Sequence, residues 1–261
     1  MSHGKRRALG QHFLRDAVVA RAIVDLLAPT AADLVVEIGP GEGALTDALV
    51  RRVGHVIALE IDHGLVERLR RRLPAVEVTE ADARTWDYGG LERPPGGRVL
   101  VVGNLPYSVG KPILQALVEA RTAIDDMALM LQLEVAERVA APPGGKTYGS
   151  LSVLTQLYCD VRLALRVPPG AFRPPPKVDS AVLRLRPLPA PRVAVRDEAR
   201  FHTVVRAAFA QRRKTLANAL AAGLGLSAVH VREAAASAGI DPGRRAETLD
   251  LKEFAELAGR L

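Results

Sequence analysis

Residues 99–107, VLVVGNLPY, pass abruptly from an apolar run to a polar turn. Four apolar residues in a row, Val99 to Val102, are typical of a strand that is buried on both faces. Pro106 has no backbone N–H and cannot extend a strand ladder, so the strand is expected to end here. Asn104 and Tyr107 would then lie where open α/β sheets bind their ligands, although a simple tight turn explains these residues equally well when they are taken alone.

A second buried strand is predicted in the stretch DLVVEIGPGEG of residues 33–43, which runs into a glycine-rich turn. Gly39 and Gly41 allow the backbone to approach a ligand closely. The next predicted strand, residues 55–61, contains Glu60 near its end, about twenty residues beyond the first glycine, where a carboxylate can accept hydrogen bonds from ribose hydroxyls. The pattern predicts a ligand that contains a nucleoside. NAD-dependent oxidoreductases share it, but the glycine turn alone supports that class.

A third predicted strand, residues 76–79, leads to Asp82. The carboxylate of Asp82 could accept a hydrogen bond from the exocyclic amine of an adenine, or it could simply cap the loop. Gly39, Glu60, Asp82 and Asn104 thus follow four successive predicted strands. This arrangement is expected for one ligand that lies across the edge of a sheet.

The second half of the chain contains a proline-rich loop and a helical tail. In the loop FRPPPKVDS, residues 172–180, the prolines fix the backbone and hold Phe172 in a defined place, either in a core or against a ligand. Composition changes at a proline-spaced linker, and the periodicity beyond it predicts helices only. We therefore expect an α/β domain over residues 1–187 and a small all-helical domain over residues 188–261.

Composition limits the compartment and the chemistry. The chain has 261 residues, of which 48% are hydrophobic, enough for one large core and a small second domain. A single cysteine, Cys159, excludes an intrachain disulfide and favours a reducing compartment such as the cytoplasm. The six histidines lack ligand spacing, so no metal site is expected. No apolar run approaches membrane-spanning length, and the basic N-terminus lacks the apolar region of a signal peptide.

A net charge of +7 favours a polyanionic partner such as a nucleic acid. The sequence QRRK, residues 211–214, is predicted at the start of the second helix of the tail, where it concentrates positive charge. A solvated helix end explains this patch about as well as contact with RNA phosphates does.

Five stretches of sequence, taken in order, resemble the ribosomal RNA adenine dimethyltransferases, and the bacterial small-subunit type in particular. The resemblance spans nearly the whole chain, and the stretches are GQHFL (10–14), EIGPG (37–41), NLPY (104–107), F-x-P-x-P-K-V-D-S (172–180) and QRRKTL (211–216).

The resemblance implies an α/β, Rossmann-like fold with the seven-stranded sheet of class I methyltransferases, a small helical C-terminal RNA-binding domain, and S-adenosylmethionine as cofactor. By the pattern of that family, the cofactor would be bound by Gln11, His12, Leu14, Gly39, Gly41, Glu60, Ile61, Asp82, Ala83 and Asn104. The catalytic site would consist of Asn104, Leu105, Pro106, Tyr107 and Phe172. The family commonly has Asn at the position of His12, so details of cofactor binding are expected to differ.

In such a site, Asn104 Oδ1 and the Leu105 carbonyl would accept the two hydrogens of adenine N6 and aim its lone pair at the methyl group. Tyr107 and Phe172 would sandwich the base. The implied reaction is N6,N6-dimethylation of two adjacent adenosines near the 3′ end of 16S rRNA, in the small ribosomal subunit or its precursor, with a role in subunit biogenesis. We expect a cytoplasmic monomer.

Two other functions remain open. The large-subunit methyltransferases that confer macrolide resistance share the Asn-x-Pro-Tyr arrangement, although residues 211–216 and the loop at Phe172 favour the small-subunit type. A protein of a different class could act chiefly by binding, as an assembly factor for immature small subunits or as a transcription accessory factor. Intact Glu60 and Asn104 argue that cofactor chemistry is retained.

Overall fold

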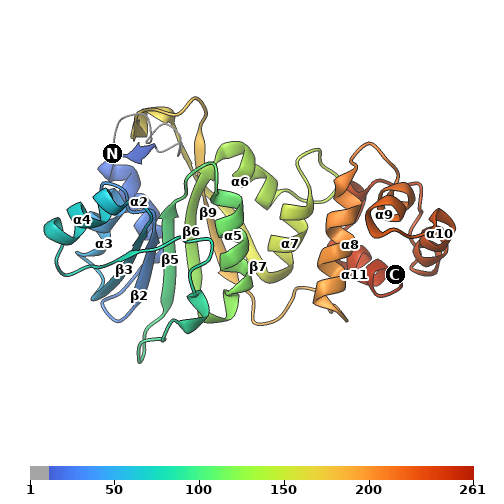
Figure 1. The fold of residues 1–261 in the computed structure, drawn as a ribbon, viewed down its shortest axis with the longest axis horizontal. Coiled ribbons are helices and arrows are strands. Elements are labelled where there is room, and N and C mark those ends of the chain that lie inside the picture. Colours follow the sequence, from blue (N-terminus) through green and yellow to red (C-terminus); the bar gives the residue numbers. More distant parts are fainter. Residues whose placement is uncertain (1–11) are drawn as a thin grey trace. The chain divides into compact units, whose positions relative to one another are not determined.

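The computed structural model describes residues 12–261, so Gln11 and the basic residues before it lie outside the described residues (Figure 1). The described chain forms two compact units. The first comprises residues 12–136 and Asp160–Pro187, and the second comprises Glu137–Cys159 and Leu188–Leu261. The second unit therefore includes a segment that lies within the predicted α/β domain of residues 1–187. Within residues 12–261, no helix is both long and apolar enough to cross a membrane.

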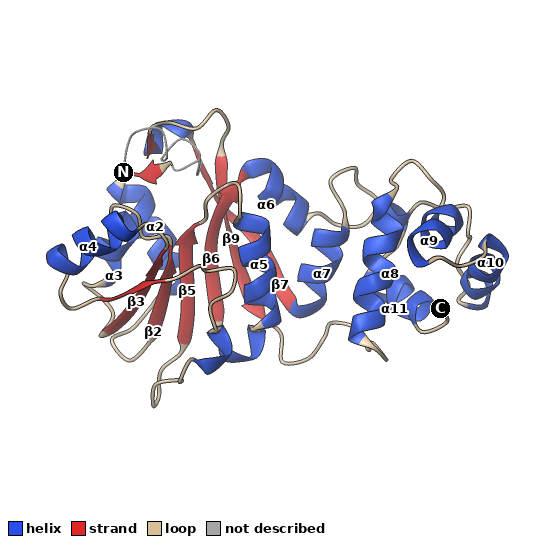
Figure 2. Cartoon of the chain, viewed as in Figure 1, coloured by secondary structure: helices blue, strands red, loops and turns tan. Residues whose placement is uncertain are grey.

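The first unit is built on a sheet of seven strands among the described residues, with helices flanking it (Figure 2). In spatial order the strands are β4 (Glu77–Glu80), β3 (His55–Glu60), β2 (Leu34–Ile38), β5 (Val99–Asn104), β6 (Asp126–Gln132), β9 (Ser180–Pro187) and β7 (Cys159–Val167). Strands β4, β3, β2, β5 and β6 pair in parallel, and β9 pairs with β6 antiparallel. This is a mixed seven-stranded sheet, so the predicted α/β class with a sheet of seven strands is confirmed.

Short elements surround the sheet. The helices are α2 (Ala17–Leu27), α3 (Ala44–Leu49), α4 (His63–Arg72), α5 (Gly110–Glu119) and α6 (Leu133–Ala140), with 3₁₀ turns η1 (Tyr88–Gly90), η2 (Arg121–Ala123) and η3 (Pro169–Ala171). Asp16 and Asp62 cap α2 and α4, each accepting a 2.8 Å hydrogen bond from a backbone N–H. A separate two-stranded sheet pairs β1 (Phe13–Leu14) with β8 (Phe172–Arg173).

The centre of the sheet is apolar on both faces, as the runs in β2 and β5 predict. Val99, Leu100, Val101 and Val102 are fully buried, and β5 lies between β2 and β6. Beyond the strand, Leu105 N still donates to the carbonyl of Met130 at 3.0 Å, and Pro106 then ends the pairing. The turn of residues 104–107 therefore emerges from the middle of the sheet.

The second unit is helical. It contains α7 (Ser150–Tyr158), α8 (Glu198–Ala210), α9 (Leu216–Leu224), α10 (Ala228–Ser237), the 3₁₀ turn η4 (Ala246–Thr248) and α11 (Leu251–Ala258). Helix α7 belongs here because Tyr158 donates to Glu198 at 2.8 Å and the backbone of Gln156 accepts from Arg192. The expectation that residues 211–214 begin a helix is wrong. They form a turn between α8 and α9, because the backbone of Thr215 is extended and the helix starts only after it.

Candidate functional site

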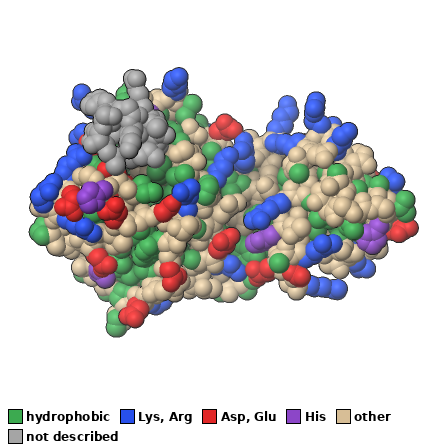
Figure 3. Space-filling view, in the orientation of Figure 1, with side chains coloured by type: hydrophobic (Ala, Val, Ile, Leu, Met, Phe, Trp, Pro, Cys, Tyr) green, Lys and Arg blue, Asp and Glu red, His purple; other side chains and the backbone are tan. Residues whose placement is uncertain are grey.

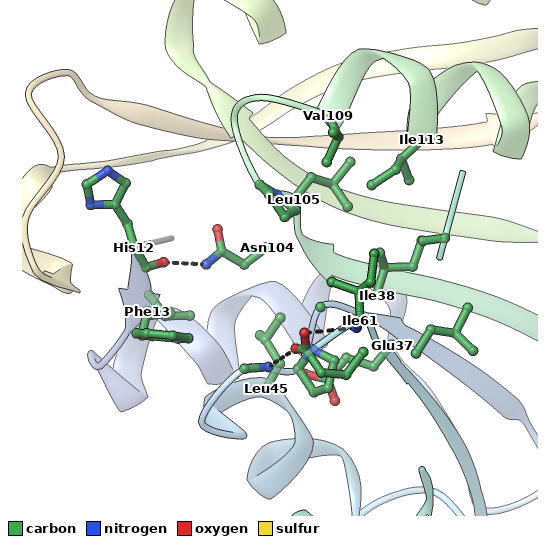
Figure 4. A pocket seen from close by; sticks show the side chains of 18 of the residues that line it. His12, Phe13, Glu37, Ile38, Leu45, Ile61, Asn104, Leu105, Val109 and Ile113 are labelled. Carbon is green, nitrogen blue, oxygen red and sulfur yellow. Dashed lines mark hydrogen bonds between the residues drawn. The ribbon is translucent and has the colours of Figure 1, made fainter. Parts of the chain in front are cut away.

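The residues of the predicted site lie around one pocket, at the carboxyl ends of β2, β3, β4 and β5. Of the predicted residues that the structure describes, every one except Phe172 lines it, namely His12, Leu14, Gly39, Gly41, Glu60, Ile61, Asp82, Ala83, Asn104, Leu105, Pro106 and Tyr107. The residues come from separate stretches of the chain that the parallel sheet brings to the same edge. Figure 4 shows several of them from close by.

The glycine turn forms the floor of the pocket. Gly39 and Gly41 both have positive φ, +64° and +58°, which residues with a side chain rarely adopt. A Cβ atom on Gly41 would also lie 2.8 Å from the ring of Phe13. Position 41 therefore requires a glycine, because its φ is positive and because Phe13 of β1 leaves no room for a Cβ atom.

Glu60 is buried beneath this turn and is held by backbone donors. Its Oε2 accepts from Gly41 N at 3.1 Å, and its Oε1 accepts from the N–H groups of Ile61 and Asp62, both at 3.0 Å. Burial raises the pKa of Glu60, and these three hydrogen bonds oppose that rise. The carboxylate is thus fixed in orientation. Oε1 already accepts two donors and Oε2 accepts one, so Oε2 still has room for a further donor.

Asp82 has a partner that the sequence did not predict. Arg84 Nε lies 3.0 Å from both carboxylate oxygens of Asp82, and Arg84 Nη2 lies 2.5 Å from Oδ2. The guanidinium lowers the pKa of Asp82. Arg84 also lines the pocket, so both charges of this pair face the position expected for a ligand.

Asn104 is oriented by His12, the residue just before β1. Its Nδ2 donates a 3.0 Å hydrogen bond to the backbone carbonyl of His12, which leaves Oδ1 as an acceptor (Figure 4). The imidazole of His12 points away from the centre of the pocket, and its Nδ1 donates to the carbonyl of Pro174 at 2.7 Å. His12 therefore acts on Asn104 through its backbone, which a different side chain at this position would preserve.

Tyr107 completes this side of the pocket. Its ring is half-buried and lies 5.5 Å, centre to centre, from the imidazole of His12. Its hydroxyl is 2.6 Å from the hydroxyl of Ser180, which is fully buried at the start of β9. Burial raises the pKa of the phenol. The ring is thus anchored at its tip while the rest of it reaches the cavity.

A model of the ribosomal RNA adenine dimethylase family matches residues 2–261. The chain belongs to this family. A protein of Geobacter metallireducens named ribosomal RNA small subunit methyltransferase A is 48% identical over 258 residues, covering 97% of this chain and 94% of that protein. One of the same name from Thiobacillus denitrificans is 45% identical over 261 residues, covering 99% and 98%.

Solved structures of similar proteins agree with the family. A dimethyladenosine transferase from Plasmodium falciparum matches with a TM-score of 0.76 at 25% identity, covering 94% of this chain and 96% of that one. The 23S rRNA methyltransferase ErmE matches with a TM-score of 0.70 at 28% identity, covering 95% and 99%. The predicted enzyme class is confirmed: the chain is a class I methyltransferase of a family that modifies adenine in ribosomal RNA, and such folds use S-adenosylmethionine.

Phe172 lies elsewhere in this dimethylase. Its ring is 4% exposed, is absent from the pocket lining, and belongs to the hydrophobic core together with Leu14 and Ala171. The backbone of Phe172 pairs with Leu14 across the β1–β8 ladder. The structure therefore places Phe172 in the core beside β1 and outside the pocket lining, and the sandwich of a base between Phe172 and Tyr107 stays a prediction.

Glu37 is a pocket residue that we did not predict. It lies in β2, lines the cavity and is 1% exposed, yet neither carboxylate oxygen has a hydrogen-bond partner among residues 12–261. Burial raises the pKa of Glu37 to about 8. The available signal was a glutamate inside the otherwise apolar run LVVEI, where a charged side chain is costly unless something binds it.

Proposed function

We propose that the chain transfers methyl groups from S-adenosylmethionine to N6 of two adjacent adenosines near the 3′ end of 16S rRNA, in the small ribosomal subunit or its precursor. Membership of the adenine dimethylase family supports the reaction. The small-subunit names of the relatives at 43–48% identity support the substrate. The observation that supports the mechanism is the orientation of Asn104 in the pocket.

Two acceptors lie side by side at the end of β5. Asn104 Oδ1 is left available because Nδ2 is engaged with His12, and no group in the described part of the chain donates to the carbonyl of Leu105. The nitrogen N6 of adenine is a poor nucleophile because its lone pair is delocalised into the ring. If these two oxygens accept both N6 hydrogens, they pull the nitrogen towards tetrahedral geometry and localise the lone pair.

Proton balance requires no strong base. Attack of N6 on the methyl group would form the N–C bond as the bond from that methyl group to sulfur breaks, with the electron pair of the broken bond left on sulfur. The nitrogen would then be positively charged and acidic. Asn104 and Leu105 hold its hydrogens until one is lost to water. The second methylation repeats this with one hydrogen remaining, so one acceptor suffices and the site must admit the first methyl group.

The pocket also fits the cofactor. When bound, S-adenosylmethionine supplies an electrophilic methyl group. A buried carboxyl group without a partner, such as Glu37, is unfavourable, and a polar group of a bound ligand would relieve it. Glu60 and Asp82 would hold the ribose and the adenine amine, while the turn at Gly39 and Gly41 would allow close approach. For Asp82, the carboxylate must share its oxygens with Arg84.

The experiment is transfer of labelled methyl groups to unmethylated small ribosomal subunits, with large subunits and free RNA alongside and the nucleosides identified afterwards. We expect dimethyladenosine from small subunits only. Labelling of large subunits would instead assign the chain to the resistance enzymes that ErmE represents. Cofactor binding without any transfer would favour the assembly-factor function.

The Asn104→Ala variant tests the mechanism. Removing one well-placed polar group from a transition-state site typically costs about 10²–10³ in rate. We expect a loss of that size with the fold retained. Asn218→Ala, on the exposed surface of α9, is the matched control and should transfer methyl groups at the wild-type rate. Full activity of Asn104→Ala would overturn the mechanism.

A further inference from the structure

A strongly basic surface adjoins the pocket in the first unit. Within residues 12–261, seven arginines line two hollows that meet the pocket at the glycine turn, and we call them the arginine band: Arg15, Arg21, Arg51, Arg52, Arg68, Arg71 and Arg72. They come from the segment between β1 and α2, from α2 itself, from the segment after α3, and from α4. Lys and Arg side chains are visible over α4 in Figure 3.

The band is continuous with the site. Gly41 and Glu42 line both the pocket and the first hollow, and Leu14 and Ala44 line both the pocket and the second. Glu42 and Arg72 line both hollows. The band therefore adjoins the pocket at the glycine turn.

The charges of the band are not balanced. In the described part of the chain, its ion-pair partners are four carboxylates: Asp25 with Arg52, Glu42 with Arg15, Asp47 with Arg72, and Glu67 with Arg71. Arg21 and Arg51 are exposed, and no hydrogen bond or ion pair joins the guanidinium group of either to another residue in 12–261. These two guanidinium groups are available to an external anion.

Arg72 ties the band to the glycine turn. Its Nη1 lies 2.8 Å from both carboxylate oxygens of Asp47, and its Nη2 donates to the carbonyl of Glu42 at 2.9 Å. A Cβ atom on Gly43, whose φ is +89°, would lie 1.9 Å from Nη2. Arg72 is thus a fixed part of the turn, whereas Arg21 and Arg51 are free to adapt to a ligand.

We propose that the arginine band binds the phosphate backbone of the RNA that carries the target adenine, with Arg21 and Arg51 making direct phosphate contacts. This inference rests on the proposed function. A base taken from its stack into the pocket leaves its flanking nucleotides outside, and the band offers them a cationic surface. Arginine forks match phosphate oxygens, and such contacts hold the RNA without reading its sequence.

The test compares Arg21→Gln, Arg51→Gln and the double variant with wild type in binding to unmethylated small subunits across a range of salt concentrations. Each lost phosphate contact reduces the slope of log affinity against log salt by about 0.7–0.9. The affinity lost between 50 and 200 mM salt should therefore shrink about threefold for each variant side chain. The rate at saturating substrate and the affinity for S-adenosylmethionine should match wild type.

Arg162→Gln is the matched control. It removes the same charge from an exposed position on β7, an edge strand outside the band, and should leave the salt slope unchanged. If Arg21→Gln and Arg51→Gln behave like Arg162→Gln while wild type methylates small subunits, the band proposal is wrong and the proposed function stands. If wild type neither binds nor methylates small subunits, the proposed function itself fails.

Discussion

Tyr107 and Phe172 both contact the N-terminal segment 12–14 but lie in very different surroundings. Tyr107 is half-buried in the pocket, with its ring beside His12 and its hydroxyl on Ser180. Phe172 is packed in the core and pairs through its backbone with Leu14. Tyr107 can therefore touch a substrate directly, whereas Phe172 supports the strand whose carbonyl, at His12, orients Asn104.

Two buried carboxylates show the same kind of contrast. Glu60 accepts three backbone hydrogen bonds, whereas Glu37 has none among the described residues. Both line the pocket at neighbouring strands. In the first pair, one ring is packed in the core and the other reaches the cavity; in the second, Glu60 is held by backbone donors and Glu37 is not. Substitutions should therefore divide into those that reduce stability and those that reduce binding or catalysis.

The largest effect is expected for Phe172→Ala, which removes a buried ring from the core. Such truncations typically cost about 3–5 kcal/mol in the free energy of unfolding. Urea denaturation should show this loss, and Phe172→Leu, which keeps most of the apolar volume, should show much less. An unfolding free energy equal to that of wild type, together with lost methyl transfer, would instead place the ring against the substrate.

This pair also shows what the sequence can and cannot predict. The apolar runs and the glycine turn predict the sheet and its ligand edge because burial and backbone conformation are local consequences of residue type. The prolines around Phe172 predict a rigid loop, but which way its ring faces depends on the distant strand at Leu14. Likewise, the pairing of Asp82 with Arg84 and the isolation of Glu37 depend on side-chain contacts that spacing does not encode.

Glu37→Gln should change how stability depends on pH. The pKa of Glu37 is about 8 in the folded protein and 4.5 in an ordinary environment, so between these values the folded state binds more protons than the unfolded state. Its contribution to stability is full below pH 4.5 and is lost as pH rises to about 8, by up to about 1.4 kcal/mol per pH unit. In the absence of cofactor, the unfolding free energy of Glu37→Gln should therefore not show this fall with rising pH.

Denaturation series at several pH values would measure that slope, with Glu92→Gln, an exposed carboxylate, as the control that leaves it unchanged. Identical slopes in wild type and Glu37→Gln would mean that Glu37 does not titrate as its burial implies. A saturating cofactor that contacts Glu37 should also reduce the wild-type slope, because the carboxyl group then gains a partner.

Tyr107→Ala should reduce methyl transfer more than it reduces stability, whereas Phe172→Ala should chiefly reduce stability. Stacking of a base on an aromatic side chain is worth about 1–3 kcal/mol. Methyl transfer to small subunits should fall by a factor corresponding to that energy, mainly through KM, while the unfolding free energy changes less than in Phe172→Ala. Equal losses of unfolding free energy in the two alanine variants would contradict the conclusion that Phe172 stabilises the core while Tyr107 serves the substrate.

The smallest expected effect comes from the hydroxyl pair that anchors Tyr107. Ser180→Ala and Tyr107→Phe each delete one hydroxyl of the 2.6 Å contact, and a hydrogen bond of this kind contributes about 0.5–1.5 kcal/mol. If Ser180 acts only by positioning the ring, both variants should lower methyl transfer similarly and the double variant should be no worse than either. Additive losses would mean that one hydroxyl has a separate partner in the bound complex.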